Sequence, residues 1–162
     1  MTDTIDSMST SKKVIGLFIW IFICSLAGLF GAQFDPGTWY ELLQKPTWTP
    51  PNWAFPIVWP ILYVMMGIAA WMLWKMENVS LSGTEFTWFF VQLILNALWS
   101  WIFFGMNLIA TGLAEILLLW VAIVFSILLF WSRNRIAGML LVPYLIWVSY
   151  ASALNFAIWQ LN

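Results

Sequence analysis

Histidine is absent from the 162-residue sequence, and cysteine occurs once, at Cys24. A chain without histidine cannot ligate zinc or haem iron through imidazole, and a single cysteine cannot close a disulfide within the chain. The same absence excludes a nucleophile that is activated by histidine. Acid–base chemistry would rest on the seven carboxylates. We therefore expect no metal site and no required cofactor.

Charge is also scarce, because only 8% of the residues are charged, compared with about 25% in an ordinary soluble domain. The six basic residues are scattered along the chain and the formal net charge is −1, so no basic patch is available for nucleic acid. Apolar residues make up 63% of the chain. A water-soluble globular protein is excluded, and nucleic acid is not expected as a partner.

Five apolar runs are each long enough to cross a bilayer, which takes about 20 helical residues. In hydrocarbon each run must be a helix, since an open strand would leave backbone groups unpaired. The sequence predicts an all-α polytopic membrane protein, a bundle of five transmembrane helices in residues 14–162. The polar residues 1–13 are expected to be a disordered tail. The predicted spans are residues 14–34, 54–76, 86–104, 108–131 and 136–161.

The basic residues predict the orientation in the membrane. With five alternating spans, one face receives five of the six basic residues, and the other receives only Lys45. Because cytoplasmic loops are enriched in lysine and arginine, we expect a cytoplasmic N-terminus and an external C-terminus in a bacterial cell membrane. The five residues on the cytoplasmic face are Lys12, Lys13, Lys75, Arg133 and Arg135.

The loop of residues 35–53, on the external side, is much longer than the other connections. It contains four prolines, which reduce the entropy lost on ordering, together with Trp39, Trp48 and Trp53. Long ordered loops are usually lids or binding loops. We expect a lid with a short helix from Thr38 to Gln44, in which Thr38 is the N-cap of a capping box.

Three spans combine aromatic and polar residues at helical spacing, so that each presents one mixed face. An apolar surface with a few orienting polar groups is typical of a ligand cavity. Gln92, Asn96 and Asn155 could instead be hydrogen-bonding links between helices, which is the competing interpretation. The predicted ligand-binding residues are Trp59 and Tyr63 on the second span, Gln92, Asn96 and Trp99 on the third, and Tyr144, Trp147, Ala151 and Asn155 on the fifth.

Two further features have open interpretations. Glu115 lies near the external end of the fourth span, where an intramembrane carboxylate is a functional candidate or reaches the lipid headgroups. The first span contains overlapping patterns of small residues that allow close helix approach. These patterns serve packing within one chain or a homodimer, and their residues are Ala27, Gly28, Gly31 and Ala32.

The segment from Trp39 to Trp53 follows the pattern W-Y-x-x-L-x-K-P-x-W-x-P-P-x-W, which orders many rare residues. It resembles the signature of the translocator protein family, also called TspO/MBR or tryptophan-rich sensory proteins. Further similarity occurs at Gln92-Leu93, around Phe103-Phe104-Gly105-Met106, and from Pro143 to Trp147. The resemblance extends from about residue 14 to the C-terminus.

The resemblance implies a five-helix bundle, commonly a homodimer, with a pocket beneath the first external loop. Relatives bind porphyrins such as protoporphyrin IX and haem, isoquinoline carboxamide and benzodiazepine drugs and, in animals, cholesterol. The positions that match the family's pocket are Trp59, Asn96 and Trp147, with Tyr63, Trp99 and Ala151 nearby. Lys45, on the loop side, could meet a porphyrin propionate.

The sequence departs in one respect from the pattern of the animal family members that bind cholesterol. No lysine or arginine follows Tyr150, which argues against tight sterol binding.

The sequence predicts a membrane receptor or sensor for tetrapyrroles, because indole faces stack on a flat π-system without a metal ligand. One alternative is an enzyme that degrades porphyrin in light, in which Trp59 and Trp147 would carry the photochemistry. Another is a transporter of porphyrins or other hydrophobic small molecules.

Overall fold

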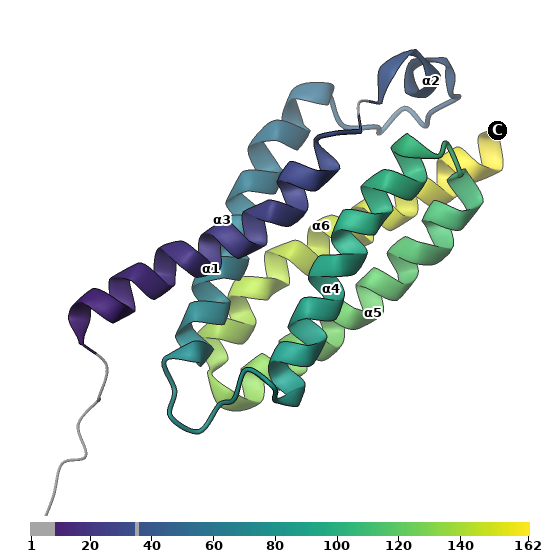
Figure 1. The fold of residues 1–162 in the computed structure, drawn as a ribbon. Coiled ribbons are helices and arrows are strands. Elements are labelled where there is room, and N and C mark those ends of the chain that lie inside the picture. Colours follow the sequence, from purple (N-terminus) through teal and green to yellow (C-terminus); the bar gives the residue numbers. More distant parts are fainter. Residues whose placement is uncertain (1–8, 35) are drawn as a thin grey trace, which may run out of the picture.

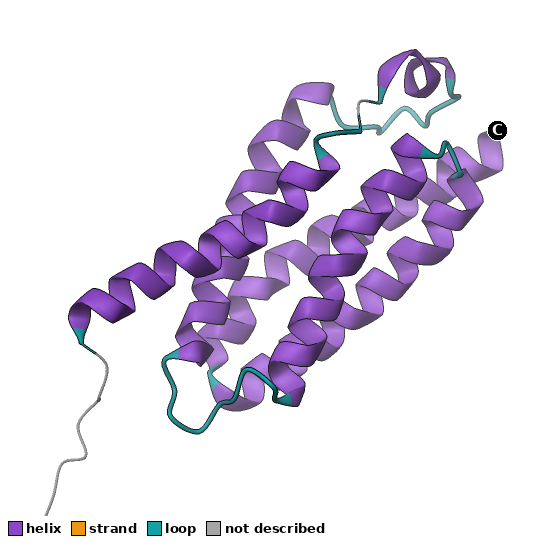
Figure 2. Ribbon diagram, viewed as in Figure 1, coloured by secondary structure: helices purple, strands orange, loops and turns teal. Residues whose placement is uncertain are grey.

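The structure, a computed structural model, describes residues 9–34 and 36–162. This part of the chain is helical and contains no strand (Figures 1 and 2). Five of its helices are long and apolar enough to cross a membrane, which confirms the predicted all-α fold with five spans. The α-helices are α1 (Thr10–Gly31), α2 (Gly37–Leu42), α3 (Phe55–Trp74), α4 (Thr84–Ser100), α5 (Ile109–Arg133) and α6 (Arg135–Leu161).

Two short turns extend the spans. The 3-10 turn η1 (Asn52–Ala54) leads into α3, and the π-helical turn η2 (Trp101–Gly105) continues α4. In η2 the Met106 amide donates to the Trp101 carbonyl, which widens the last turn. Phe103 in this turn is buried and stacks on Trp99, with ring centroids 5.1 Å apart. The turn therefore directs an aromatic ring inward at the loop end of the bundle.

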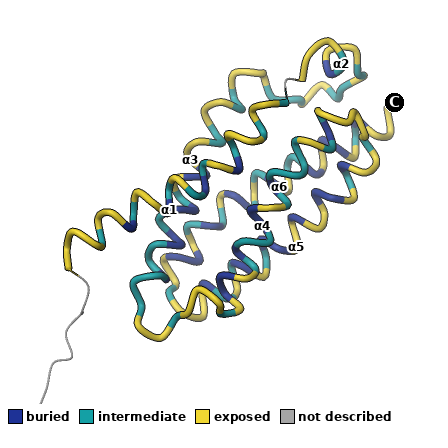
Figure 3. The backbone as a smooth tube through the Cα atoms, in the orientation of Figure 1, coloured by how far each residue is buried: buried dark blue, intermediate teal, exposed yellow. Residues whose placement is uncertain are grey.

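The five long helices form a closed ring in the order α1, α3, α6, α5 and α4. Buried and exposed residues are interspersed along each of these helices (Figure 3), and many of the exposed residues are large and apolar. The C-terminus lies near α2 at one end of the bundle, and the first described residues lie toward the opposite end (Figure 1). Chain ends at opposite ends of the bundle are expected for an odd number of membrane crossings.

Helix α1 begins at Thr10, four residues before the predicted start of the first span. The Ser9 side chain caps it by accepting a hydrogen bond from the Lys12 amide. Residues 10–13 of the predicted tail are therefore helical, because capping extends a helix beyond the apolar run that marks the membrane. Residues 1–8 of that tail lie outside the described residues.

Small residues on α1 and α3 bring helices together within one chain. A Cβ atom at Gly67 would lie 2.6 Å from the Cα atom of Ile21, and one at Gly28 would lie 2.3 Å from Cε2 of Tyr63. A Cβ atom at Gly31 would similarly crowd a side chain of α4. Of the two interpretations of the small-residue stripe, the structure therefore supports packing within the chain. A homodimer through Gly28 and Gly31 would require these contacts to open.

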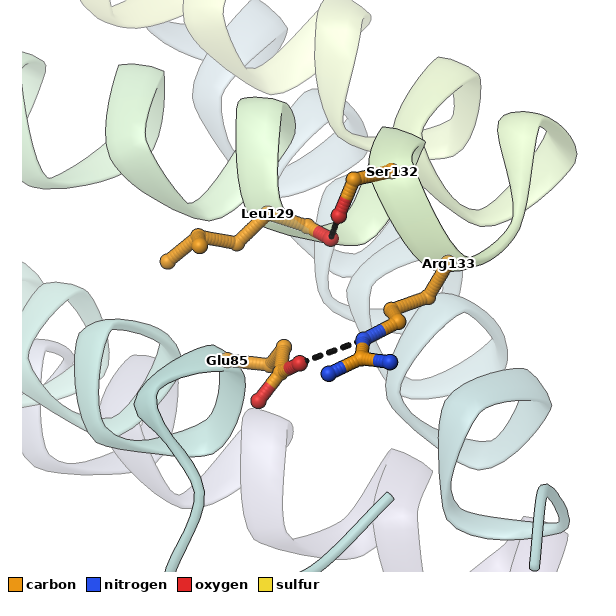
Figure 4. A network of polar contacts seen from close by, with 4 residues as sticks. All are labelled: Glu85, Leu129, Ser132 and Arg133. Atoms are coloured by element: carbon orange, nitrogen blue, oxygen red, sulfur yellow. Dashed lines mark hydrogen bonds and ion pairs between the residues drawn. The ribbon is translucent and has the colours of Figure 1, made fainter. Parts of the chain in front are cut away.

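At the end of the bundle opposite α2, an ion pair joins α4 and α5. Arg133 Nε in the last turn of α5 lies 2.6 Å from Glu85 Oε1 in the first turn of α4, while Ser132 Oγ donates to the Leu129 carbonyl nearby (Figure 4). Each charge also complements the dipole of its own helix, negative at the N-terminus and positive at the C-terminus. The ion pair therefore links α4 and α5 at the end of the bundle farthest from the loop of residues 35–53.

Candidate ligand-binding site

A row of aromatic rings runs from the loop into the bundle. Trp48 lies edge-on to Tyr150 at 5.6 Å between ring centroids, and Tyr150 stacks on Trp147 at 6.0 Å. Trp147 in turn meets the edge of Trp59 at 6.4 Å, and Trp59 stacks on Tyr63 at 5.6 Å. We call these five residues the aromatic wall. The wall joins two helices, α3 and α6, with the loop, and its neighbouring rings alternate between edge-on and stacked contacts.

A chain of hydrogen bonds lies at the inner end of the aromatic wall. The Tyr63 hydroxyl donates to Asn96 Oδ1 at 2.8 Å, and Asn96 Nδ2 donates to the Tyr144 hydroxyl oxygen at 3.0 Å. All three residues are buried. We call this the polar relay. It links α3, α4 and α6, so Asn96 acts as an interhelical link as well as a candidate ligand contact.

A second polar cluster lies nearer the loop. Trp99 Nε1 donates to Asn155 Oδ1 at 3.3 Å, and Asn155 Nδ2 donates to the Ile109 carbonyl at 3.0 Å. Trp99 and Asn155 are therefore occupied with each other rather than with the polar relay. Ala151, one helical turn from Trp147, is half-buried and packs against the core.

Three side chains have buried polar atoms without a hydrogen-bond partner among the described residues. They are the amide of Gln92, Trp147 Nε1 and both carboxylate oxygens of Glu115. Leaving such a group unpaired costs roughly 1–3 kcal/mol, so each is a candidate contact for a ligand. Gln92 lies one turn from Asn96, and Trp147 belongs to the aromatic wall. Glu115 is only 7% exposed, so its carboxylate lies among protein atoms.

An apolar groove of about 400 Å³ opens between α3 and α6 beside the aromatic wall. Its size falls in the range of about 300–1,000 Å³ found for small-molecule sites. Trp147 and Tyr150 form part of both the groove and the aromatic wall. The groove is lined by Pro50, Val58, Leu62, Pro143, Ile146, Trp147 and Tyr150.

The loop covers the end of the bundle through Tyr40 and Trp39. Tyr40 is buried and lies edge-on to Phe104 at 5.5 Å, and Trp39 lies edge-on to Phe103 at 5.6 Å. Burial raises the pKa of the Tyr40 hydroxyl, and the nearby Tyr150 raises it further, so the hydroxyl stays neutral. The short helix predicted in this loop is present as α2, which stands over this end of the bundle (Figure 1).

Two details of the predicted lid differ in the structure. Helix α2 begins at Gly37, after Pro36 and without a side-chain cap, so the predicted capping box at Thr38 is wrong. Gly37 enters the helix with a φ of 53°, a conformation that glycine adopts without the steric cost of a side chain. Trp53 is 67% exposed and lies away from the bundle interior, as an interfacial tryptophan would.

Lys45 is engaged within the loop. Its ammonium donates to the carbonyls of Tyr40, Glu41 and Leu43 and lies 4.6 Å from the centroid of the Tyr40 ring. A cation suits these carbonyls because they form the C-terminal end of α2. The predicted contact between Lys45 and a propionate would require it to exchange some of these bonds.

The sequence did not reveal the residues that fasten the loop to α6. The Tyr150 hydroxyl donates to the Trp48 carbonyl, and the Gln44 backbone exchanges two hydrogen bonds of 3.0 Å with the Asn162 side chain. These contacts join residues more than 100 positions apart, and a helical pattern carries no signal for them. They hold the loop against α6 and the C-terminal residue.

A sequence model of the TspO/MBR family matches residues 19–160, nearly the whole described chain. The chain belongs to this family. It is 43% identical over 146 residues to Protein CrtK of Rhodobacter capsulatus, covering 89% of this chain and 91% of the relative. To the tryptophan-rich protein TspO of Chlorobaculum tepidum it is 44% identical over 159 residues, covering 94% and 99%.

Animal proteins of the TspO/MBR family are also similar over most of their length. The human translocator protein is 35% identical over 146 residues, covering 85% of each chain. The family and the five apolar helices together make this chain an integral membrane protein.

Proposed function

We propose that this TspO/MBR protein is a membrane receptor for tetrapyrroles such as protoporphyrin IX and haem. The observation that carries the proposal is the aromatic wall, which runs from Trp48 in the loop to Tyr63 inside the bundle. A porphyrin ring can stack on such a surface without a metal ligand. The apolar groove beside the wall gives the ligand access from the bilayer, where a hydrophobic tetrapyrrole partitions.

The same site accommodates isoquinoline carboxamide or benzodiazepine ligands in this proposal. Such ligands combine aromatic rings with a carbonyl oxygen, and Trp147 Nε1 is a buried donor without a protein partner among the described residues. Asn96 supplies a second donor through its amide nitrogen. Aromatic surface with one or two orienting donors is the usual composition of a drug-sized site.

A titration with protoporphyrin IX and haem tests the proposal. In detergent-purified protein, a bound porphyrin should quench tryptophan fluorescence in a saturable way. Samples kept in the dark measure binding alone, and parallel illuminated samples report whether porphyrin absorbance is lost. Linear, non-saturable quenching that equals the quenching of free tryptophan would refute the receptor.

Asn96→Ala should weaken binding of an isoquinoline carboxamide about 5- to 150-fold, since a hydrogen bond lost in a dry site costs roughly 1–3 kcal/mol. Protoporphyrin IX, held mainly by stacking, should lose less affinity. Because Asn96 also bridges Tyr63 and Tyr144, the variant should melt at a lower temperature. Competition binding and thermal unfolding measure the two effects. Lower stability with unchanged affinity would reduce Asn96 to an interhelical link.

We further propose that the N-terminus faces the cytoplasm and the C-terminus faces outward. Five of the six basic residues lie at the end of the bundle opposite α2, and such residues are retained on the cytoplasmic side. A reporter that is active only outside the cytoplasm should work at the C-terminus and fail at the N-terminus. The opposite pattern would reverse the orientation and place α2 inside the cell.

A further inference from the structure

A second groove, of about 590 Å³, opens between α1 and its neighbours α3 and α4 and shares no residue with the aromatic wall. We call it the α1 groove. It lies toward the N-terminal end of α1, where this helix diverges from α4 (Figure 1). Trp20 in its lining stacks on Phe90 of α4 at 6.0 Å between ring centroids. A Cβ atom at Gly16 would collide with the Trp74 ring, so this glycine lets Trp74 lie against α1 and form one side of the groove.

The length of the α1 groove matches the depth of one bilayer leaflet. From Lys12 to Ile23 the groove follows α1 over about 16 Å, at about 1.5 Å of rise per residue. Half of a hydrocarbon core of about 30 Å is nearly the same distance. Ile15 and Ile19 on its rim are more than half exposed, and they belong to a helix apolar enough to cross a membrane. The groove therefore lies at the depth and along the direction of a lipid acyl chain.

Positive charge gathers at the outer end of this groove. Lys12, in the first turn of α1, is the one charged residue in a lining that is otherwise apolar among the described residues. It forms no ion pair within the part of the chain that the structure describes. Lys75 is held nearby, because its ammonium lies 3.5 Å from the centroid of the Trp71 ring and Trp71 Nε1 donates to the Lys13 carbonyl at 2.8 Å. The first turn of α1 thus has a second cation beside it.

Acidic side chains at this end leave the positive charge uncompensated. The described residues here include five basic side chains and two acidic ones, Glu77 and Glu85. Glu85 is bound to Arg133, and Glu77 is exposed in the loop between α3 and α4. The N-terminal end of α1 adds the positive pole of a helix dipole. The mouth of the groove therefore favours an anion.

We propose that the α1 groove binds an anionic phospholipid, with one acyl chain along the groove and the headgroup phosphate at Lys12. This site goes beyond the proposed receptor function and uses a different face of the bundle. A lysine ammonium makes a short, charge-assisted hydrogen bond to phosphate. A zwitterionic lipid offers the same phosphate and chains, but its own cation is repelled by the positive mouth. A second copy of the chain in the same membrane orientation would bring its own basic end toward Lys12, so charge favours the lipid.

Two lipids with identical chains test the headgroup contact. Native mass spectrometry of the detergent-purified protein measures the binding of dioleoylphosphatidylglycerol, which is anionic, and of dioleoylphosphatidylcholine, which is zwitterionic. The anionic lipid should bind at least about 5-fold more tightly, which corresponds to about 1 kcal/mol for one lysine near a headgroup. Lys12→Gln should remove most of this preference. Arg135→Gln is the matched control, since Arg135 is an exposed basic residue at the same end of the bundle but outside the groove, and it should keep the preference.

A separate pair of variants tests the acyl chain. Ile19→Trp fills the groove and leaves Lys12 in place, so binding of the anionic lipid should weaken at least about 5-fold. Leu29→Trp enlarges an exposed residue of the same helix outside the groove and should leave binding unchanged. Thermal unfolding checks that each variant is folded, and Ile15→Trp serves if Ile19→Trp is not.

Every other outcome overturns the lipid site. Equal binding of the two lipids would show that the positive mouth does not select a headgroup. A preference that survives Lys12→Gln, or that Arg135→Gln lowers equally, would come from the general charge of this end. Unchanged binding in Ile19→Trp would place the chain elsewhere. A dimer that dissociates in Ile19→Trp, without any headgroup preference, would assign the groove to a second copy of the chain.

Discussion

Trp147→Ala should weaken binding of protoporphyrin IX about 10- to 100-fold, which corresponds to roughly 1.4–2.7 kcal/mol. Trp147 connects the two halves of the aromatic wall, because it contacts Tyr150 on the loop side and Trp59 on the inner side. Its removal would take away a large apolar ring and interrupt the surface on which a porphyrin stacks. A fluorescence titration of the variant beside the native protein measures the change.

Two further variants separate the contributions of the ring. Trp147→Phe keeps an aromatic face and removes the N–H group, so its effect on porphyrin should be small and its effect on a carboxamide ligand larger. Trp159→Ala, on the exposed side of the same helix, is the matched control and should leave both affinities unchanged. If Trp159→Ala weakens porphyrin binding as much as Trp147→Ala does, the ligand binds on the lipid-facing surface and not along the aromatic wall.

The long-range architecture could be predicted because it follows from local composition. Apolar length gives the five spans, and helical spacing places Trp59 and Tyr63 on one face of α3, and Tyr144 and Trp147 on one face of α6. The structure brings these faces together around Asn96. That these two helix faces bind a ligand stays a prediction.

The partner of each polar group could not be predicted, because it depends on how neighbouring helices are rotated about their axes. Spacing alone puts Gln92 and Asn96 on the same face of α4, yet Asn96 bridges two tyrosines while Gln92 has no partner among the described residues. The π-helical turn at the end of α4 and the contact between Gln44 and Asn162 likewise depend on tertiary packing. A periodic pattern predicts which face of a helix points inward, whereas the structure shows which residues that face contacts.

Gly67→Ala should cause the largest loss of stability of the substitutions considered. The added methyl group would lie 2.6 Å from the Cα atom and 2.8 Å from the backbone nitrogen of Ile21, so α1 and α3 would have to separate. Overpacking usually costs about 1–3 kcal/mol, and a clash with backbone belongs at the upper end of that range because no side chain can rotate away. Thermal unfolding in detergent should show a melting temperature several degrees below that of the native protein.

Matched substitutions identify the clash as the cause. Val64→Ile adds one methyl group to an exposed position of the same helix and should leave the melting temperature unchanged. Ile21→Ala should not rescue Gly67→Ala, since the crowded Cα and nitrogen atoms remain. Gly28→Ala differs in kind, because its methyl group meets the Tyr63 ring, which can move only by giving up its bond to Asn96. Gly28→Ala should therefore weaken ligand binding as well as stability. If Gly67→Ala leaves the melting temperature unchanged, α1 and α3 do not pack at this glycine.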